Sequence, residues 1–299
     1  MSVGAAAASR AGRRAERSRR TRRRKLAGRT GWNIVGIAVT VVLVFPVFWM
    51  ISTAFKSDDE ILSGSWLPLH PTLQHFRSAI AGTDHPYFWD SVLNSLFVVG
   101  VTVALSMVLA FFAAVALAKS RFTGLKFFIV VMIGIQMLPQ AGLIIPLYLV
   151  LRQYGMVGTL TGVVVTYMTF VLPFAVWTLR GFLIGIPKDL EEAAMVDGST
   201  RLGAFARILL PLVAPGLVAT SVFTFITAWN EFIFANVLLN NNAKQTITVW
   251  LSYFTGTSRN TDWGALMAAS TLTAIPVVAF FILVQRKIAF GLTAGAVKG

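Results

Sequence analysis

The chain has 299 residues, of which 56% are hydrophobic and only 13% are charged, and its formal net charge at pH 7 is +14. A soluble domain carries about 25% charged residues, so this composition excludes an ordinary soluble enzyme and indicates an integral membrane protein. The absence of cysteine excludes disulfides, a thiol nucleophile and a thiolate metal site.

Residues 1–31 form a basic arm that holds 11 Lys and Arg between Arg10 and Arg29. Nucleic-acid binding, a transit peptide and a cleaved signal peptide are alternative interpretations of such an arm. Because it has no apolar face and runs directly into a long apolar stretch, we favour a juxtamembrane arm that contacts anionic membrane lipid and expect no nucleic-acid partner.

Six stretches contain no charged residue and are long enough to cross a bilayer, which takes about 20 residues. Barrel strands alternate in polarity over about ten residues, so these continuous runs predict an all-α integral membrane protein with six transmembrane helices. The domain that they form covers residues 32–286, with a short tail over residues 287–299. The predicted spans are Trp32–Phe55, Ser91–Ala118, Phe127–Leu151, Gln153–Leu179, Ile208–Asn230 and Trp263–Gln285.

The distribution of Lys and Arg predicts the orientation, because these residues concentrate on the cytoplasmic side. A cytoplasmic N-terminus places 21 of the 26 Lys and Arg inside and 5 outside. We therefore expect both termini, and the segment between the fourth and fifth spans, in the cytoplasm.

Two of the expected external segments carry polar clusters. The first, residues 56–90, contains the acidic run Asp58-Asp59-Glu60 and the histidines at 70, 75 and 85. The spacing of the histidines is not that of a compact metal site, so we expect solvated histidines and no bound metal. The second, Asn236–Asp262, combines polar residues with Trp250, Tyr253 and Phe254. It fits either contact with a binding protein or an interfacial hairpin with an aromatic belt.

Polar residues inside the spans are candidates for a substrate pathway. Pro139 and Pro146 interrupt the third span close to the amide side chain of Gln136. Transporters use such broken helices to bind their substrates. In the fifth span four polar residues at steps of four, three and four share one helical face. Amides and phenols suit an uncharged solute such as a sugar; ordinary helix packing remains the alternative, and Glu231 alone also fits an interfacial carboxylate. The candidates are Gln136, Tyr167, Thr224, Thr227, Asn230 and Glu231.

The segment from residue 187 to 211 predicts two short amphipathic helices. Pro187 and the acidic residues after it suit a first helical turn. Gly198 suits the left-handed end of that helix, and Ser199 can cap the next. The apolar stripe of the second helix would be Leu202, Phe205, Ala206 and Leu209. Such a pair fits a groove on a partner protein, or it lies on the membrane surface.

Seven of these residues match a known pattern: Glu-Ala-Ala, three residues, Gly, nine residues, Ile-x-Leu-Pro. They are Glu192, Ala193, Ala194, Gly198, Ile208, Leu210 and Pro211. The segment resembles the signature loop of ABC-importer permeases, at which the membrane subunit docks on an ATPase. Trp229-Asn230-Glu231-Phe232, Asp262-Trp263-Gly264 and the tail Gly291–Gly299 are similar to MalG-type permeases, from the carbohydrate-uptake branch of these importers. The resemblance implies ATPase-coupling roles for the seven residues and for Glu191 and Asp197.

The resemblance also implies a type I importer fold (MetI-like) in a bacterial cell membrane. Its partners would be a second, similar permease, two ATP-binding subunits and an extracytoplasmic solute-binding protein that delivers sugar. The chain has no Gly-Lys pair, hence no Walker A loop, and no His-Glu-x-x-His or Gly-x-Ser-x-Gly motif. We therefore expect no enzyme and no cofactor on this chain, with ATP and Mg²⁺ on the partner ATPase. The alternatives are a permease for another solute, such as glycerol phosphate or an unusual oligosaccharide, and a secondary transporter or channel that works alone.

Overall fold

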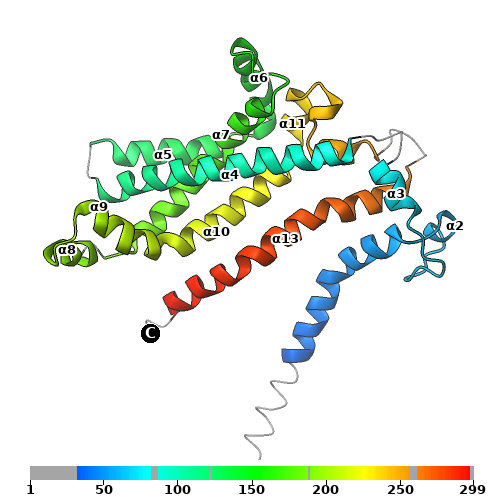
Figure 1. Cartoon of the computed structure of the whole chain (residues 1–299), viewed down its shortest axis with the longest axis horizontal. Helices are drawn as coiled ribbons and strands as arrows, with labels where there is room; N and C mark the ends of the chain where they lie inside the picture. The colour runs from blue at the N-terminus through cyan, green and yellow to red at the C-terminus, as the bar shows by residue number, and fades with distance from the viewer. Residues whose placement is uncertain (1–31, 82–86, 121–122, 188, 256–260, 297–299) are drawn as a thin grey trace, which may run out of the picture.

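The computed structural model describes residues 32–81, 87–120, 123–187, 189–255 and 261–296, and side-chain surroundings up to residue 285. Within these ranges all regular secondary structure is helical, which confirms the all-α prediction (Figure 1). The basic arm, His85 and the last three residues of the tail lie outside the described residues.

Five helices are long and apolar enough to cross a membrane, and a sixth span results if one bent pair counts as a single span. The pair joins α5 to the segment that ends in α6. The five are the helix Trp32–Ala54, α4 (Phe88–Lys119), α7 (Leu160–Ile184), the run Arg201–Trp229 that ends in α10 (Leu210–Trp229), and α13 (Trp263–Ala296), whose apolar part ends at Gln285.

The third predicted span, Phe127–Leu151, is not one straight helix. Helix α5 (Leu125–Gln136) is followed by a 3₁₀ turn, η1 (Gln140–Leu143), and by α6 (Ile144–Gln153), with a bend of 97°. The break falls at Pro139, because the residue before a proline is disfavoured in the helical conformation. Pro146 causes no break, since it occupies the first turn of α6, where a missing N–H is tolerated.

The fourth span begins seven residues later than its predicted start at Gln153. Gly155 and Gly158 have φ angles of +65° and +76° and turn the chain after α6. The Thr159 side chain then accepts a hydrogen bond from the Gly162 N–H and caps α7. The helix also continues past Arg180, whose Nε donates to the Leu117 carbonyl 3.4 Å away.

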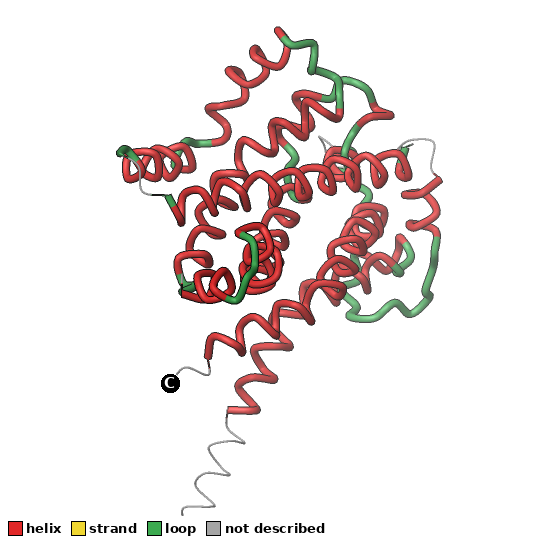
Figure 2. The backbone as a smooth tube through the Cα atoms, turned by 60° about the vertical axis from the view of Figure 1, so that its left-hand side comes forward, coloured by secondary structure: helices red, strands yellow, loops and turns green. Residues whose placement is uncertain are grey.

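The bundle core is built from α4, α7 and α10, with α13 packed against α10 (Figures 1 and 2). One buried cluster, around Trp250 and Val163, fills the end of the bundle where α7 begins. A second, around Leu179 and Leu209, fills the opposite end. The helix Trp32–Ala54 diverges from this bundle in Figure 1. Before its buried end at residues 52–54 it has an exposed apolar surface, which suits contact with lipid or another subunit.

The segment after α10 folds back onto α4. It comprises α11 (Ile233–Leu238), η3 (Asn242–Lys244) and α12 (Ile247–Ser252). The Asn94 amide donates to the Ala243 and Gln245 carbonyls, at 2.9 and 3.1 Å. Trp250 is completely buried, so the expectation that it anchors a contact surface or an aromatic belt is wrong.

The segment between the first helix and α4 is more ordered than a solvated loop. It contains α2 (Asp58–Ile61) and α3 (Gln74–Ala81), and the Glu60 carboxylate accepts hydrogen bonds from the Leu69 and His70 N–H groups. His70 is exposed, as expected, but His75 is only 3% exposed. The prediction of solvated histidines is therefore wrong for His75, which packs between two elements far apart in sequence.

The start of α7 depends on a glycine with no room for a side chain. A Cβ at Gly162 would lie 2.3 Å from the Met156 carbonyl oxygen, and backbone cannot rotate away as a side chain can. We expect Gly162→Ala to lower the unfolding free energy by about 1–3 kcal/mol, the usual effect of overpacking. Thermal unfolding of the purified protein in detergent measures this, with Gly181→Ala on the same helix as the control, because its Cβ meets nothing within 4 Å. Equal unfolding midpoints for the two variants would contradict the expectation.

Candidate functional site

The signature segment forms a helical hairpin, here called the signature hairpin (residues 189–204), made of α8 (Asp189–Val196) and α9 (Arg201–Ala204). Gly198 ends α8 with a φ of +88°, the left-handed conformation predicted for it. The Ser199 N–H donates to the Ala194 carbonyl at 2.9 Å, which is the long-range hydrogen bond of a Schellman cap.

The second helix of the hairpin differs from the prediction in two ways. Its cap is Thr200 rather than Ser199, because the Thr200 Oγ1 accepts from the Gly203 N–H at 3.1 Å. It is also not a separate short helix, since α9 continues through a π-turn, η2 (Phe205–Leu209), into α10. The π-turn directly precedes Pro211, which lacks the N–H needed for a regular helical bond, and π-turns are frequent at functional sites.

Most of the residues in the hairpin are exposed or only partly buried. Ala194 and Ala204 are buried, whereas Glu192, Ala193, Asp197 and Gly198 are exposed. Within the predicted apolar stripe of the second helix, Leu202 is 78% exposed and Ala206 is exposed, whereas Leu209 is buried. Val196 is 87% exposed. Apolar side chains exposed together on a hairpin tip are typical of a protein interaction site.

An ion pair that the sequence did not indicate connects the hairpin to the bundle. The Lys119 ammonium, at the end of α4, contacts the Glu191 carboxylate in the first turn of α8. Both side chains are partly buried, and they border a cavity of about 630 Å³ between α4 and the hairpin. The two residues are 72 positions apart, so no local pattern could have paired them.

A second cavity, of about 450 Å³, lies where α7 meets the end of α10. It brings together four of the six residues predicted for the substrate pathway: Tyr167, Thr227, Asn230 and Glu231. Three residues that were not predicted from the sequence complete its polar and aromatic lining: Gln140, Phe170 and Phe232. Gln140 lies in η1, and Phe170 and Phe232 occupy positions that belong to no periodic pattern of polar residues.

The other two predicted pathway residues do not line this cavity. Gln136 lines a neighbouring cavity of about 120 Å³, which shares Gln140 and Phe170 with the larger one. Thr224 is completely buried, and its Oγ1 has no hydrogen-bond partner in the part of the chain that the structure describes.

Glu231 is held by the backbone around it. Its carboxylate accepts hydrogen bonds from the Phe234 and Ala235 N–H groups, at 2.9 and 3.2 Å, and so caps α11. Its carbonyl oxygen accepts from the Tyr167 hydroxyl at 3.4 Å and from the Thr248 hydroxyl at 2.8 Å. The cavity wall therefore has a fixed shape at this point, built on hydrogen bonds from three helices.

Comparison with known proteins gives the family. Residues 106–294 match the family of binding-protein-dependent transport system inner membrane components. The chain belongs to this family. The match extends from the middle of α4 to the end of α13, so both cavities and the signature hairpin lie within the family's shared region.

Individual relatives of this inner membrane component are consistent with the family assignment of the chain. It is 45% identical to the diacetylchitobiose uptake system permease protein DasC of Streptomyces coelicolor, over 92% of this chain and 99% of DasC. It is 35% identical to the trehalose transport system permease protein SugB of Mycobacterium tuberculosis, over 90% of this chain and 98% of SugB.

A solved structure shares the fold. A chain of a bacterial ABC transporter that imports the acidic polysaccharide alginate superposes with a TM-score of 0.70 and 22% identity, over 88% of this chain and 96% of that one. The predicted membership among ABC-importer permeases and the permease fold are thereby confirmed. The protein is a multi-pass membrane component of a transporter and not an enzyme.

Proposed function

We propose that this permease is one of two similar membrane subunits that together form the pathway of an ATP-driven sugar importer in a bacterial cell membrane. The proposal rests on the signature hairpin. Its tip carries Gly198 in the left-handed backbone conformation together with exposed apolar side chains. Two copies of an ATPase, which hold the ATP and Mg²⁺, dock below the permease pair, and a solute-binding protein delivers sugar from outside.

The hairpin is built to transmit motion from the ATPase. Its second helix is continuous with α10, so displacement of the hairpin moves a transmembrane helix directly. Its first helix is tied to α4 by the ion pair between Lys119 and Glu191. Movement of the docked ATPase upon nucleotide binding therefore reaches two core helices, and the bundle alternates between outward and inward access.

The cavity between α7 and α10 supports a sugar as the substrate. A phenol, two amides and a hydroxyl line it together with the aromatic rings of Phe170 and Phe232. These side-chain types bind uncharged, hydroxyl-rich ligands. Among the described residues no Lys or Arg lines it, which disfavours a phosphorylated solute such as glycerol phosphate. DasC and SugB, the relatives described above, are permeases for sugars.

The same cavity disfavours a secondary transporter that works alone. Such a transporter uses membrane carboxylates that take up and release coupling ions. In the part of the chain that the structure describes, Glu231 is the one carboxylate that lines the cavity. Both of its oxygens accept from backbone N–H groups of α11. Its position therefore fits a structural cap better than an ion carrier.

Cysteine substitution tests the docking and the orientation together, because the chain has no cysteine of its own. We expect Val196→Cys and Leu202→Cys to form cross-links to cysteines introduced in the ATPase and to react with impermeant thiol reagents only from the cytoplasmic side. Asn241→Cys, in the segment before α12, should react only from outside. Val39→Cys, on the exposed first helix, serves as the control that does not cross-link to the ATPase. External labelling of the Val196→Cys variant would contradict the orientation, and cross-linking no stronger than that of the Val39→Cys variant would contradict the docking.

A further inference from the structure

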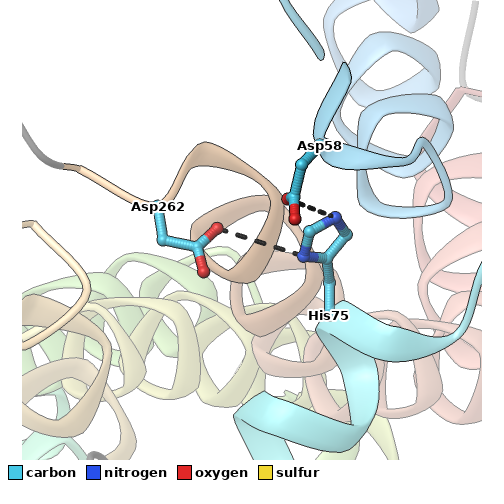
Figure 3. A group of neighbouring side chains, drawn as sticks. All are labelled: Asp58, His75 and Asp262. Atoms are coloured by element: carbon cyan, nitrogen blue, oxygen red, sulfur yellow. Dashed lines mark ion pairs between the residues drawn. The ribbon is translucent and has the colours of Figure 1, made fainter. Parts of the chain in front are cut away.

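Three titratable side chains from separate segments meet at the start of α13 (Figure 3). They are Asp58 at the start of α2, His75 on α3 and Asp262 just before α13. The Nε2 of His75 lies 3.6 Å from the Asp58 Oδ1, and its Nδ1 lies 4.0 Å from the Asp262 Oδ1. The function proposed above uses none of these residues.

The imidazole is fixed in orientation and in tautomer. Its Nε2 lies 3.0 Å from the Lys56 carbonyl oxygen, which can only accept, so the Nε2 carries the hydrogen. Gly264 packs on the ring face, where a Cβ would come within 2.2–2.5 Å of three ring atoms. Because the side chain is 4% exposed, it cannot turn away, and the lone pair of neutral Nδ1 points toward Asp262.

The distance from Nδ1 to Asp262 does not fit a hydrogen bond. Nitrogen–oxygen hydrogen bonds in proteins span about 2.7–3.2 Å, which is well short of the observed 4.0 Å. One metal–nitrogen bond of about 2.0–2.1 Å and one metal–oxygen bond of about 2.0–2.2 Å bridge such a distance. The Asp262 carboxylate is 59% exposed and has room to turn closer as the coordination angle requires.

We propose that Asp58, His75 and Asp262 bind a divalent transition-metal cation of the Zn²⁺ type, which fastens the α2–α3 segment to the start of α13. The Nδ1 of His75 and the Asp262 carboxylate are its first two ligands. The ligand atoms of all three residues lie within 4.8 Å of one another, so the 71% exposed Asp58 side chain reaches the ion by rotation. Water completes the coordination from the open side.

The surroundings of the cluster favour a cation. The Nε2–H bond to a backbone carbonyl is the arrangement that orients metal-binding histidines through their second nitrogen. The Lys56 ammonium is engaged elsewhere, since it donates to the Ser65 carbonyl and lies over the Trp49 ring. A nitrogen ligand disfavours Ca²⁺ and Mg²⁺, which prefer oxygen.

The site also gives a role to the sequence Asp262-Trp263-Gly264. Asp262 both caps α13, by accepting from the Ala265 N–H at 2.9 Å, and faces His75. Gly264 provides the flat surface for the ring. The bound cation would therefore fix the start of the sixth span relative to the segment that follows the first span, on the face that we assign to the outside of the cell.

Metal binding to the whole transporter complex in detergent tests the proposal. After treatment with a chelator and its removal, the complex is titrated with Zn²⁺ against a competing fluorescent indicator. We expect Asp262→Asn, Asp58→Asn and His75→Ala each to weaken one Zn²⁺ site per copy of this chain by about tenfold or more. Asp262→Asn is the most informative variant, because asparagine preserves the cap of α13.

The exposed His70, five residues before His75, provides the matched control, since His70→Ala should leave Zn²⁺ affinity unchanged. Zn²⁺ should also raise the thermal midpoint of the wild-type complex but not that of Asp262→Asn, and Ca²⁺ should have no such effect. If wild type and Asp262→Asn bind Zn²⁺ equally, or if neither is stabilised by it, the proposal is overturned and the cluster is an ordinary ion-pair contact.

Discussion

Gly198→Val is expected to separate ATP hydrolysis from sugar transport. A Cβ at this position would meet nothing within 4 Å, so the effect comes from the backbone alone. The φ of +88° costs a residue other than glycine about 1–2 kcal/mol, and a β-branched valine is among the least tolerant. A penalty of that size lowers the equilibrium ratio of native to non-native hairpin about 5- to 30-fold. Co-purification of the ATPase and sugar-stimulated ATP hydrolysis in proteoliposomes should both fall, by at most a similar factor.

A second substitution at the same position separates backbone strain from side-chain bulk. Asparagine adopts the left-handed conformation more readily than other non-glycine residues. We therefore expect Gly198→Asn to retain most of the ATPase association, although its side chain is as large as that of valine. If both variants lose association equally, the loss is steric at the docking surface and the hairpin geometry is not its cause. Full coupling in Gly198→Val would remove the hairpin from the mechanism.

Thr227→Trp is expected to block transport while leaving the ATPase bound. Thr227, on α10, lines the cavity of about 450 Å³ together with Tyr167. An indole in this cavity occupies the space of the substrate, and forcing side chains apart to make room costs about 1–3 kcal/mol. Sugar uptake should fall about tenfold or more, whereas co-purification of the ATPase should not change, because the signature hairpin lies at the other end of α10.

Phe223→Trp provides the control for an added indole on the same helix. Phe223 is 45% exposed and stacks on Phe174, outside the cavity lining. We expect this variant to insert and transport as the wild type does. Wild-type uptake by Thr227→Trp would show that the substrate takes a different path, and equal losses in both variants would indicate a general intolerance of α10 to tryptophan.

The sequence predicted the elements that depend on local chemistry. Apolar length alone identified the spans, and Gly198 was correctly assigned to a left-handed helix end because few other residues adopt that conformation. The break in the third span was predicted at two prolines but occurs only at Pro139. Pro146 falls in the first turn of α6, and the position of a helix start cannot be read from a uniformly apolar run.

Features that depend on tertiary contact could not be predicted in this way. The burial of His75 and Trp250 depends on segments that fold back onto distant helices, and neither position shows a periodic pattern. The pairing of Lys119 with Glu191 likewise requires the fold to bring two helix ends together. For the cavity, the sequence identified Tyr167 and Glu231 as polar residues, but only the structure joins them through a backbone carbonyl.

We infer that this chain carries sugar only as part of an ATP-driven complex. Sugar uptake by proteoliposomes that contain the permease pair and its ATPases, with the binding protein on the side opposite the ATPases, tests this inference. We expect uptake only when hydrolysable ATP and the sugar-loaded binding protein are both present, and no loss of uptake when ion gradients are dissipated. Uptake that persists with a non-hydrolysable ATP analogue and stops when an ion gradient is removed would contradict it.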